Sequence, residues 1–237
     1  MATLYSAIKD DLLAKIKDGL YKEGDIIPSE VDLAKNYGVS RPTIRQALQI
    51  LVNEGYLEKR RRRGTIVTKP KIEQAFAMGV RSFEDDMIRA GRVVRSAVII
   101  FKREIAGEDV ATHLELPQHS EVFKLVRLRY VDEQPNVFVE SYLPAERYPS
   151  LDTYDFTTKR LYGAMEEIGK PVVRAHRKLE AIKADSALAA LLDIDAGDPL
   201  FLFHTTGRDE DGVAVEYSIA TYRGENNIFE FDVSRAN

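Results

Sequence analysis

The sequence contains no cysteine, no tryptophan and only four histidines. Without cysteine there can be no disulfide, no thiolate metal ligand and no cysteine nucleophile, and a reducing cytoplasm is the expected location. The histidines are scattered without metal-ligand spacing, so we expect no metal site and no cofactor. No apolar run approaches the roughly 20 residues that a membrane-spanning helix needs, and the N-terminal stretch lacks a secretory signal pattern. The sequence therefore predicts a cytoplasmic protein with no membrane partner.

The short motifs that accompany catalysis are also missing. There is no G-x-S-x-G elbow, no phosphate-binding Walker loop and no G-x-G-x-x-G fingerprint. The acidic stretch DEDG at 209–212 has too few oxygen ligands for a calcium loop and fits a hairpin turn. From its motifs we expect this protein not to be an enzyme.

Charge is distributed unevenly along the chain. The formal net charge is −4, yet residues 1–69 carry 13 Lys and Arg against 9 Asp and Glu. Within residues 40–71 there are nine basic residues and two acidic ones. A basic segment joined to an acidic remainder predicts that one part binds a polyanion while the other part has a different task.

The basic part has the pattern of three short helices. Apolar residues at helical spacing predict an amphipathic helix that ends near Gly19. Ser29 is predicted to be the N-cap of a helix that stops at Gly38, and Ser40 the N-cap of another helix that runs to Gly55. Two short helices joined by a tight turn predict a helix-turn-helix, whose second helix enters the DNA major groove.

The exposed side of this second helix carries the chemistry of base recognition. Ile44, Leu48, Leu51 and Val52 form the expected buried stripe. The other side presents Arg, Thr and Gln side chains, which pair with guanine, thymine and adenine edges, and the capped helix N-termini favour phosphate. The predicted contacts in the two helices are Ser29, Ser40, Arg41, Thr43, Arg45 and Gln46.

The stretch EKRRRRGTIV at 58–67 follows the predicted recognition helix. Two short β segments on either side of a basic turn predict a hairpin, the wing of a winged helix. Arg61, Arg62 and Arg63 would neutralise phosphates or enter the minor groove, and Gly64 would allow a close approach of the backbone. The alternative is a solvated basic turn, which the preceding helix-turn-helix makes less favoured.

The chain from about residue 80 onward is rich in strands with helices between them. It lacks regular β-α alternation, so we expect an α+β domain built on an antiparallel sheet. The segment 69–79 has two lysines and a proline and is predicted to be a linker. A weak internal repeat relates 114–146 to 192–225 and would make Glu140 and Glu216 equivalent.

Two-residue alternation places candidate binding residues on strand faces. Arg127 and Arg129 share a face with apolar residues, so they either meet an anion inside the domain or lie on the solvent side with acidic partners. Glu216 and Tyr222 share a face with small residues, which fits either hydroxyl recognition in a cavity or an exposed edge.

The first 68 residues resemble the DNA-binding domain of the GntR superfamily of bacterial transcription regulators. The stretches that carry this resemblance are GDIIPSE, YGVSRPTIRQAL, LVNEGYL and the final RGT. The resemblance implies that Arg41 reads a base edge and that Thr43 and Arg45 contact phosphate or flanking bases. The family commonly has Arg after P-S-E, whereas this chain has Val31, so the usual operator sequence is not assumed.

Residues 80–237 resemble the effector-binding UTRA domain of HutC-type GntR regulators, whose fold is similar to chorismate lyase. The stretches are FEDDMIRAG, KLVRLR, FVESYLP and VEYSIATYRG. The resemblance implies that arginines and a preceding loop hold the anionic group of the effector, and that carboxylates and tyrosines contact its hydroxyl or amine groups. The implied residues are Arg81, Ser82, Phe83, Arg127, Arg129, Glu140, Tyr162, Glu216 and Tyr222.

Arg81 and Arg160 stand where sugar-phosphate sensors tend to carry small hydroxyl residues. Either they meet an additional charge of the ligand, or they pair with nearby acids and narrow the pocket. The resemblance therefore favours a small anionic, hydroxylated metabolite, such as a phosphosugar, over any one named compound.

Together these patterns predict a homodimeric transcription regulator that binds a pseudo-palindrome of double-stranded operator DNA. The favoured type of regulator is a repressor. Its parts would be a winged helix-turn-helix at 1–68, a linker at 69–79, and an effector-binding and dimerisation domain at 80–237. One alternative is a chorismate-lyase-like enzyme fused to a DNA-binding module. Another is an architectural protein that binds any duplex and responds to no metabolite.

Overall fold

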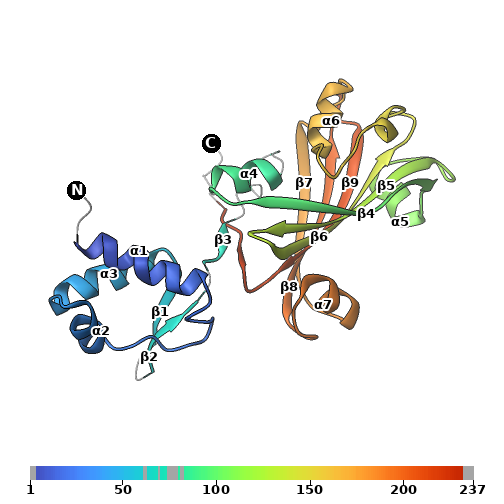
Figure 1. Ribbon diagram of the computed structural model, residues 1–237. Coiled ribbons are helices and arrows are strands. Elements are labelled where there is room, and N and C mark those ends of the chain that lie inside the picture. Colours follow the sequence, from blue (N-terminus) through green and yellow to red (C-terminus); the bar gives the residue numbers. More distant parts are fainter. Residues whose placement is uncertain (1–3, 61–62, 69, 74–79, 81–82, 232–237) are drawn as a thin grey trace, which may run out of the picture. The chain divides into compact units, whose positions relative to one another are not determined.

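The chain divides into two compact units (Figure 1). The computed structural model describes residues 4–60, 63–68, 70–73, 80 and 83–231. The units are Met1–Ile72 and Glu73–Asn237, and the division between them falls within the predicted linker. Each unit is described by itself. None of the helices in the described ranges is both long enough and apolar enough to cross a membrane.

The N-terminal unit begins with three helices, α1 (Leu4–Lys17), α2 (Glu30–Tyr37) and α3 (Arg41–Asn53). Ser29 and Ser40 cap α2 and α3 by accepting backbone N–H bonds, at 3.2 and 3.4 Å. Gly38 ends α2 in the left-handed conformation, with φ of 63°. The buried stripe of α3 consists of Ile44, Ala47, Leu48 and Leu51.

Two expectations for these helices need adjustment. The first helix ends at Lys17, and Leu20 lies beyond it with 66% of its surface exposed. Val52 is only half-buried, and Ala47 takes the place expected for it in the core. Positions 44, 47, 48 and 51 follow the i, i+3, i+4, i+7 spacing of one helix face, from which position 52 is rotated away.

A polar cluster ties α1 to α2. Lys15 donates to the Asp11 carboxylate at 2.8 Å and to the Tyr37 hydroxyl at 3.1 Å, and Tyr37 in turn donates to Asp11. The Lys15 and Tyr37 hydrogen bonds hold the pKa of Asp11 below its usual value. This cluster fixes the helix that carries Glu30 at its first position.

A hairpin of β1 (Leu57–Arg60) and β2 (Gly64–Val67) follows α3, with Lys59 opposite Thr65. The chain around Ile26 pairs with the outer side of β2, through bonds such as Ile27 N–H to Thr65 C=O at 3.0 Å. Gly64 has φ of +100°, and a Cβ there would come within 3.2 Å of Ile26. The three helices and this hairpin form a winged helix-turn-helix.

The C-terminal unit is built on a six-stranded antiparallel sheet in the order β4-β5-β6-β9-β8-β7. Its strands are β4 (Val94–Ile105), β5 (Glu121–Val131), β6 (Gln134–Pro144), β7 (Arg174–Lys183), β8 (Pro199–Arg208) and β9 (Ala214–Arg223). Strand β4 runs over twelve residues with a bulge near Ile99. The expected α+β fold on an antiparallel sheet is confirmed.

Helices cover both faces of this sheet (Figure 1). The first turn of α6 (Leu161–Glu167) packs with Phe123 and Leu125 of β5. On the opposite face, α5 (Glu108–His113) packs against Val122 and α7 (Ser186–Leu192) against Leu128. The remaining elements are the short helices α4 (Phe83–Arg89) and η2 (Leu151–Thr153) and the two-residue strands β3 (Ile72–Glu73) and β10 (Asn227–Ile228).

The predicted repeat corresponds to two units of a helix followed by a hairpin. These are α5 with β5 and β6, and α7 with β8 and β9, and the returning strands β6 and β9 pair with each other at the centre of the sheet. In that pairing Ser141 lies opposite Ser218, whereas Glu140 lies opposite Ile219. The two helix-plus-hairpin repeats therefore bring their side chains together at the centre of the sheet.

Candidate functional site

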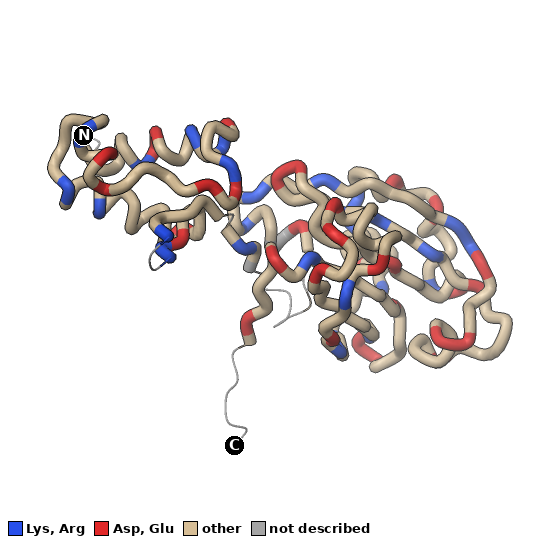
Figure 2. The backbone as a smooth tube through the Cα atoms, turned by 90° about the horizontal axis from the view of Figure 1, so that it is seen from below, with Lys and Arg blue, Asp and Glu red and all other residues tan. Residues whose placement is uncertain are grey.

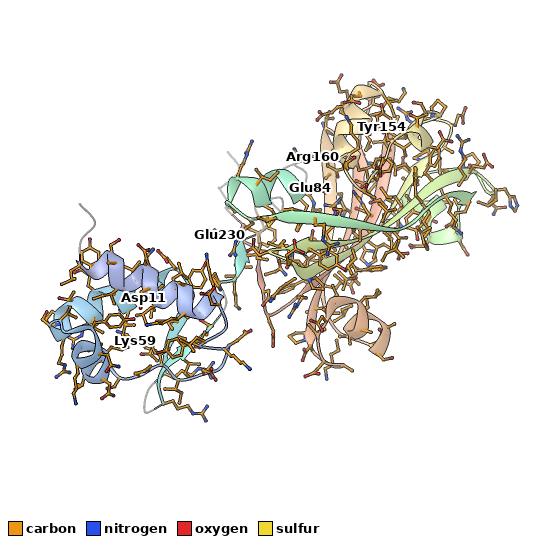
Figure 3. The ribbon with its side chains drawn as sticks, viewed as in Figure 1. Asp11, Lys59, Glu84, Tyr154, Arg160 and Glu230 are labelled. Atoms are coloured by element: carbon orange, nitrogen blue, oxygen red, sulfur yellow. The ribbon has the colours of Figure 1, made fainter. Side chains whose placement is uncertain are left out.

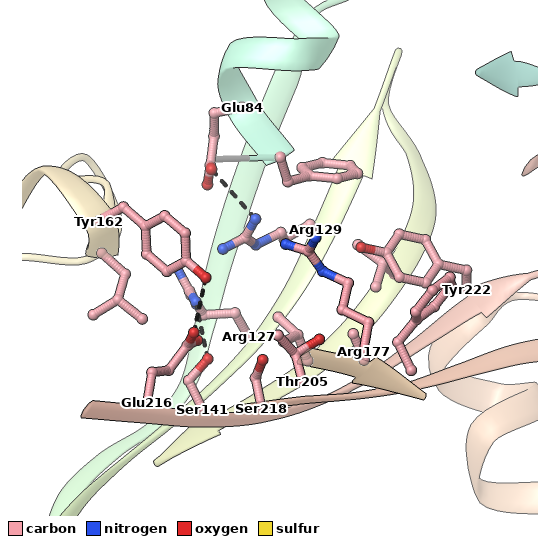
Figure 4. Close-up of a pocket in the computed structure, with 16 residues that line it drawn as sticks. Glu84, Arg127, Arg129, Ser141, Tyr162, Arg177, Thr205, Glu216, Ser218 and Tyr222 are labelled. Atoms are coloured by element: carbon pink, nitrogen blue, oxygen red, sulfur yellow. Dashed lines mark hydrogen bonds and ion pairs between the residues drawn. The ribbon is translucent and has the colours of Figure 1, made fainter. Parts of the chain in front are cut away.

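A pocket opens on the face of the sheet that carries Arg127 and Arg129 (Figure 4). Its floor comes from β5, β6, β8 and β9, and α4 and α6 contribute to its walls. The polar lining residues are Glu84, Arg127, Arg129, Ser141, Tyr162, Arg177, Thr205, Glu216, Ser218 and Tyr222. Phe83, Leu161, Phe203 and small apolar residues of the central strands complete the lining.

Arg127 is the most deeply buried cation of this pocket, with 2% of its surface exposed. Burial lowers its pKa, and the neighbouring charge of Arg129 lowers it further, to about 9, so the guanidinium stays charged at neutral pH. Its contact with the Ser141 hydroxyl is long, at 3.5 Å. The Nε atoms of Arg127 and Arg129 are buried and have no hydrogen-bond partner among the described residues. Buried donors in this state are ready to bind an acceptor.

Arg129 has an internal anionic partner. Its Nη1 lies 3.3 Å from a carboxylate oxygen of Glu84, at the start of α4 (Figure 4), and both side chains are largely buried. The Phe83 ring lies 5.3 Å from the Arg129 guanidinium carbon. Burial raises the pKa of Glu84, but the charges of Arg129 and Arg127 outweigh it and hold that pKa below its usual value. Glu84 is therefore a carboxylate that occupies the arginine cluster.

Glu216 lies at the other side of the pocket. The Tyr162 hydroxyl donates to Glu216 Oε2 at 2.8 Å (Figure 4). Burial raises the pKa of Glu216, against the opposing effects of the Tyr162 hydrogen bond and the charges of Arg127 and Arg177. Burial and the adjacent Glu216 charge also raise the pKa of Tyr162. This pair can accept a hydrogen bond from a ligand hydroxyl or amine.

Gly207 of β8 makes room for that carboxylate. It pairs with Glu216 in the sheet register. A Cβ at position 207 would lie 2.9 Å from Val172 and 3.3 Å from Glu216 Oε2. A side chain here would press on both neighbours, so glycine is required by a close approach and not by a positive φ.

The structure brings together most of the predicted effector-binding residues. Phe83, Arg127, Arg129, Tyr162, Glu216 and Tyr222 line the pocket. Arg81 and Ser82 lie outside the described residues. Arg160 occupies the N-cap position of α6 without a side-chain capping bond (Figure 3). It is half-buried and is not among the lining residues, although its charge contributes to the lowered pKa of Glu84.

Glu140 requires a correction. Its side chain points to the opposite face of the sheet, where it pairs with Lys124 at 3.0 Å. Successive strand residues face opposite sides, so the residue that the resemblance and the repeat alignment pointed to is one position away from the residue that faces the pocket. Its neighbour Ser141 occupies the pocket position on β6.

Five polar lining residues were absent from the predicted site, namely Ser141 and the four that follow. Arg177 lies on the edge strand β7, where alternating charged residues also fit a solvated edge. Glu84 directly follows Phe83, which was predicted to line the site. The signal that could have identified Glu84 is an acidic residue next to a segment expected to lie close to two arginines. Thr205 and Ser218 carried no signal beyond their position on a strand face.

The exposed side of α3 is the second candidate site. Arg41, Arg45 and Gln46 are exposed there, while Thr43 is half-buried beside the Ser40 cap. Arg41 makes no hydrogen bond or ion pair with any residue in the described ranges. Val31, on the preceding helix, is 54% exposed and offers no polar group to a base.

The wing adds further positive charge (Figure 2). Lys59, Arg60 and Arg63 are exposed, and Arg60 pairs with Glu58 at 3.0 Å. Arg61 and Arg62 lie outside the described residues. Among the residues that are described, no cluster of His, Asp and Glu could hold a metal ion.

A chain that contains a winged helix-turn-helix unit and a second unit with an arginine-lined pocket has the architecture of a ligand-responsive bacterial regulator. Residues 4–67 match the profile of bacterial regulatory proteins of the gntR family, and residues 89–226 match the UTRA domain. The chain belongs to the GntR family and is of the type that carries a UTRA domain, as HutC-type regulators do.

Named relatives agree with this assignment. The chain is 34% identical over 227 residues to the HTH-type transcriptional repressor NagR of Bacillus subtilis (strain 168), covering 95% of this chain and 93% of that protein. It is 32% identical over 233 residues to the "Probable fructoselysine utilization operon transcriptional repressor" of Escherichia coli O157:H7, covering 98% and 95%.

A solved structure shows the same arrangement of elements. The crystal structure of PhnF from Mycobacterium smegmatis matches with a TM-score of 0.79 and 29% identity, covering 99% of this chain and all of that one. These relatives are transcription regulators and not enzymes. The comparisons give no support to the chorismate-lyase-like alternative, and this chain is a transcription regulator of the GntR family.

Proposed function

We propose that this protein is a homodimeric repressor that binds a pseudo-palindromic operator and releases it when a small anionic, hydroxylated metabolite occupies the UTRA pocket. The observation that carries the proposal is a pocket lined by three arginines, two glutamates and two tyrosines. A regulator that acts on chromosomal DNA works in the cytoplasm.

The anionic part of the ligand follows from the charges. Three guanidinium groups face two carboxylates, which leaves an excess of positive charge in the pocket. Arg127 and Arg129 retain buried Nε donors, and guanidinium groups suit the several acceptor oxygens of a phosphate. A phosphate monoester, which carries about 1.5–2 negative charges at neutral pH, matches this excess.

The opposite wall of the pocket indicates what the uncharged part of the ligand carries. Glu216 and Tyr162 form a hydrogen-bonded pair there, and the hydroxyls of Ser141, Thr205 and Ser218 line the floor. Such a set can pair with several hydroxyl or amine groups at once. A phosphosugar has an anion at one end and hydroxyls along the rest, and fructoselysine utilization in a relative's name is consistent with a sugar-derived effector.

The DNA side follows from α3 and the wing. Arg41, Arg45 and Gln46 present base-reading chemistry, and the basic wing residues supply phosphate contacts. Because two-fold symmetry requires two half-sites, a dimer would bind a pseudo-palindrome. The coupling between ligand and operator is then a free energy of about 1–3 kcal/mol, equal in both directions.

A thermal-shift screen of the full chain tests the proposal. The panel holds hexose and hexosamine phosphates, the matching sugars without phosphate, and small carboxylic acids. We expect the phosphosugars to raise the melting temperature, because a ligand that binds only the folded state stabilises it by mass action. A hit is then added to a mobility-shift assay with promoter fragments from the regulator's own neighbourhood.

Release of the DNA by the same phosphosugar would support the proposal. It would be overturned if no anion stabilised the protein, or if the protein ignored promoter fragments at low ionic strength.

A further inference from the structure

Glu30 contacts two cations of the DNA-binding surface. This residue is the first of α2, and its carboxylate accepts hydrogen bonds from Arg45 of α3, at 3.1 Å to Nε and 2.9 Å to Nη2. The same carboxylate lies 3.9 Å from Lys59 Nζ of the wing strand β1. One acid thus joins the support helix, the recognition helix and the wing.

The contact with Arg45 has a defined geometry. Glu30 occupies the edge of the guanidinium formed by Nε and Nη2, so the Nη1 side remains available for another partner. The Arg45 side chain is 58% exposed, which means that it is held in place by this contact more than by packing. A planar guanidinium fixed along one edge can present its other edge in a single orientation.

Arg41 provides the contrast on the same helix. It lies one turn before Arg45 on the same exposed face, because positions i and i+4 are neighbours on a helix. Arg41 has no hydrogen bond or ion pair with another described residue. The two arginines therefore approach DNA differently, with Arg41 unrestrained and Arg45 oriented.

Orientation and neutralisation have separate consequences for DNA binding. A side chain that is already ordered loses less conformational entropy when it forms a contact. A cation that is already paired with a carboxylate contributes less to the general attraction of phosphates. Glu30 would itself repel a phosphate that approached Arg45 from the wrong side.

We propose that Glu30 is a specificity-determining positioning residue of the DNA interface. It holds Arg45 in one orientation and partly neutralises Arg45 and Lys59, so that these cations add to sequence discrimination and little to non-specific affinity. The proposal rests on the proposed operator binding. The Arg45 hydrogen bond, followed by the charges of Arg45 and Lys59, keeps the pKa of Glu30 below its usual value, so the carboxylate is ionised at neutral pH.

The test compares Glu30→Gln with the wild type in the full chain. The specific probe is the duplex that the wild-type protein enriches from a random-sequence library, and the non-specific probe is a scrambled duplex of equal composition. We expect Glu30→Gln to bind the scrambled duplex several-fold more tightly, with a salt slope steeper by about 1 for a freed cation. The ratio of specific to non-specific affinity should fall about tenfold, as for loss of one oriented base contact.

Glu58→Gln is the matched control, because it removes the same charge from the wing, where Glu58 pairs with Arg60. We expect this variant to tighten binding to both duplexes equally and to keep their ratio. In an Arg45→Ala background, Glu30→Gln should no longer change the ratio, since its effect acts through Arg45.

Each outcome separates the proposals. If the wild type enriches no duplex, operator binding itself fails. If the wild type enriches a duplex and Glu30→Gln behaves like Glu58→Gln in ratio and salt slope, the role of Glu30 is overturned. Thermal unfolding of each variant shows whether it is folded, and Glu30→Asp, which keeps the charge but shortens the reach, should restore the salt slope without restoring the full ratio.

Discussion

Two Arg–Glu pairs, one in each unit, differ in their exposure to solvent. In the N-terminal unit the Arg45 and Glu30 side chains are 58% and 23% exposed, whereas in the C-terminal unit those of Arg129 and Glu84 are 10% and 14% exposed. Water can hydrate either side chain of the first pair, so DNA can separate this pair at little cost in free energy. The second pair has little access to water, so only a ligand that supplies an equivalent anion can replace Glu84.

The difference shows how one chain can use the same two residue types for different tasks. An exposed pair can orient a side chain and still exchange partners rapidly with a charged polymer. In the proposed effector site, a buried pair would keep an arginine in place for an anionic ligand and would discriminate against molecules that lack the charge. The following predictions test this contrast, from the largest expected effect to the smallest.

Arg127→Met should abolish the response to the effector. The substitution removes the most buried cation of the pocket while keeping a side chain of similar length, and loss of one partner in a buried charge pair costs about 2–5 kcal/mol of binding. Isothermal titration with the phosphosugar from the screen measures the loss, and operator affinity should be unchanged. Lys124→Met removes a cation from the other face of β5 and is the control. Loss of operator binding by a folded Arg127→Met protein would show that the arginine has a structural role.

Arg41→Ala should weaken operator binding by about 1–3 kcal/mol and relax the base preference at one position of each half-site. The reason is that this exposed arginine can pair with a guanine edge. Binding to a set of duplexes with single base-pair changes measures the preference. If the affinity falls equally for every duplex, Arg41 contacts phosphate and does not read a base.

Glu84→Gln should increase effector affinity by about 1 kcal/mol, a free energy at the lower end of typical couplings. The neutral amide no longer competes with the ligand anion for Arg129, and it no longer repels that anion. Glu140→Gln, on the opposite face of the sheet, removes the same charge outside the pocket and should change nothing. A weaker effector affinity in Glu84→Gln would instead make Glu84 a direct ligand contact.

Arg63→Ala should weaken binding to all duplexes to the same small extent and reduce the salt slope by about 1. Arg63 is an exposed wing residue, and a cation that meets phosphate carries no sequence information. Titration of operator and scrambled duplexes at several salt concentrations gives the slope. A change in the ratio of the two affinities would place Arg63 at a base edge.

The parts of the molecule that were predictable from the sequence are those governed by local rules. Capping serines and a left-handed glycine located the helices around the turn at Gly38, and alternation put Arg127 and Arg129 on one strand face. In each case the signal lies within a few residues of the feature it predicts. The same holds for the strand β9, where Glu216 and Tyr222 share the pocket face as alternation required.

The parts that were not predictable depend on pairing between distant segments. Glu140 was assigned to the pocket from the family resemblance and from a repeat alignment that matched it to Glu216, but its strand register places it on the other side of the sheet. Arg177 reaches the pocket only because β7 pairs with β8, where Arg177 lies opposite Thr205, 28 residues further along the chain. The Glu84–Arg129 contact joins residues that are 45 positions apart in the sequence, and no pattern within a few residues predicts a contact over that separation.

Gly207 has a consequence for how sequences of this kind can diverge. Its missing side chain leaves the space that Glu216 and Val172 share. An alanine at position 207 would be tolerated only together with a smaller residue at position 172 or a shorter acid at position 216. Substitutions at these three positions should therefore occur as linked changes, and a pocket that has lost this glycine should accept a different set of metabolites.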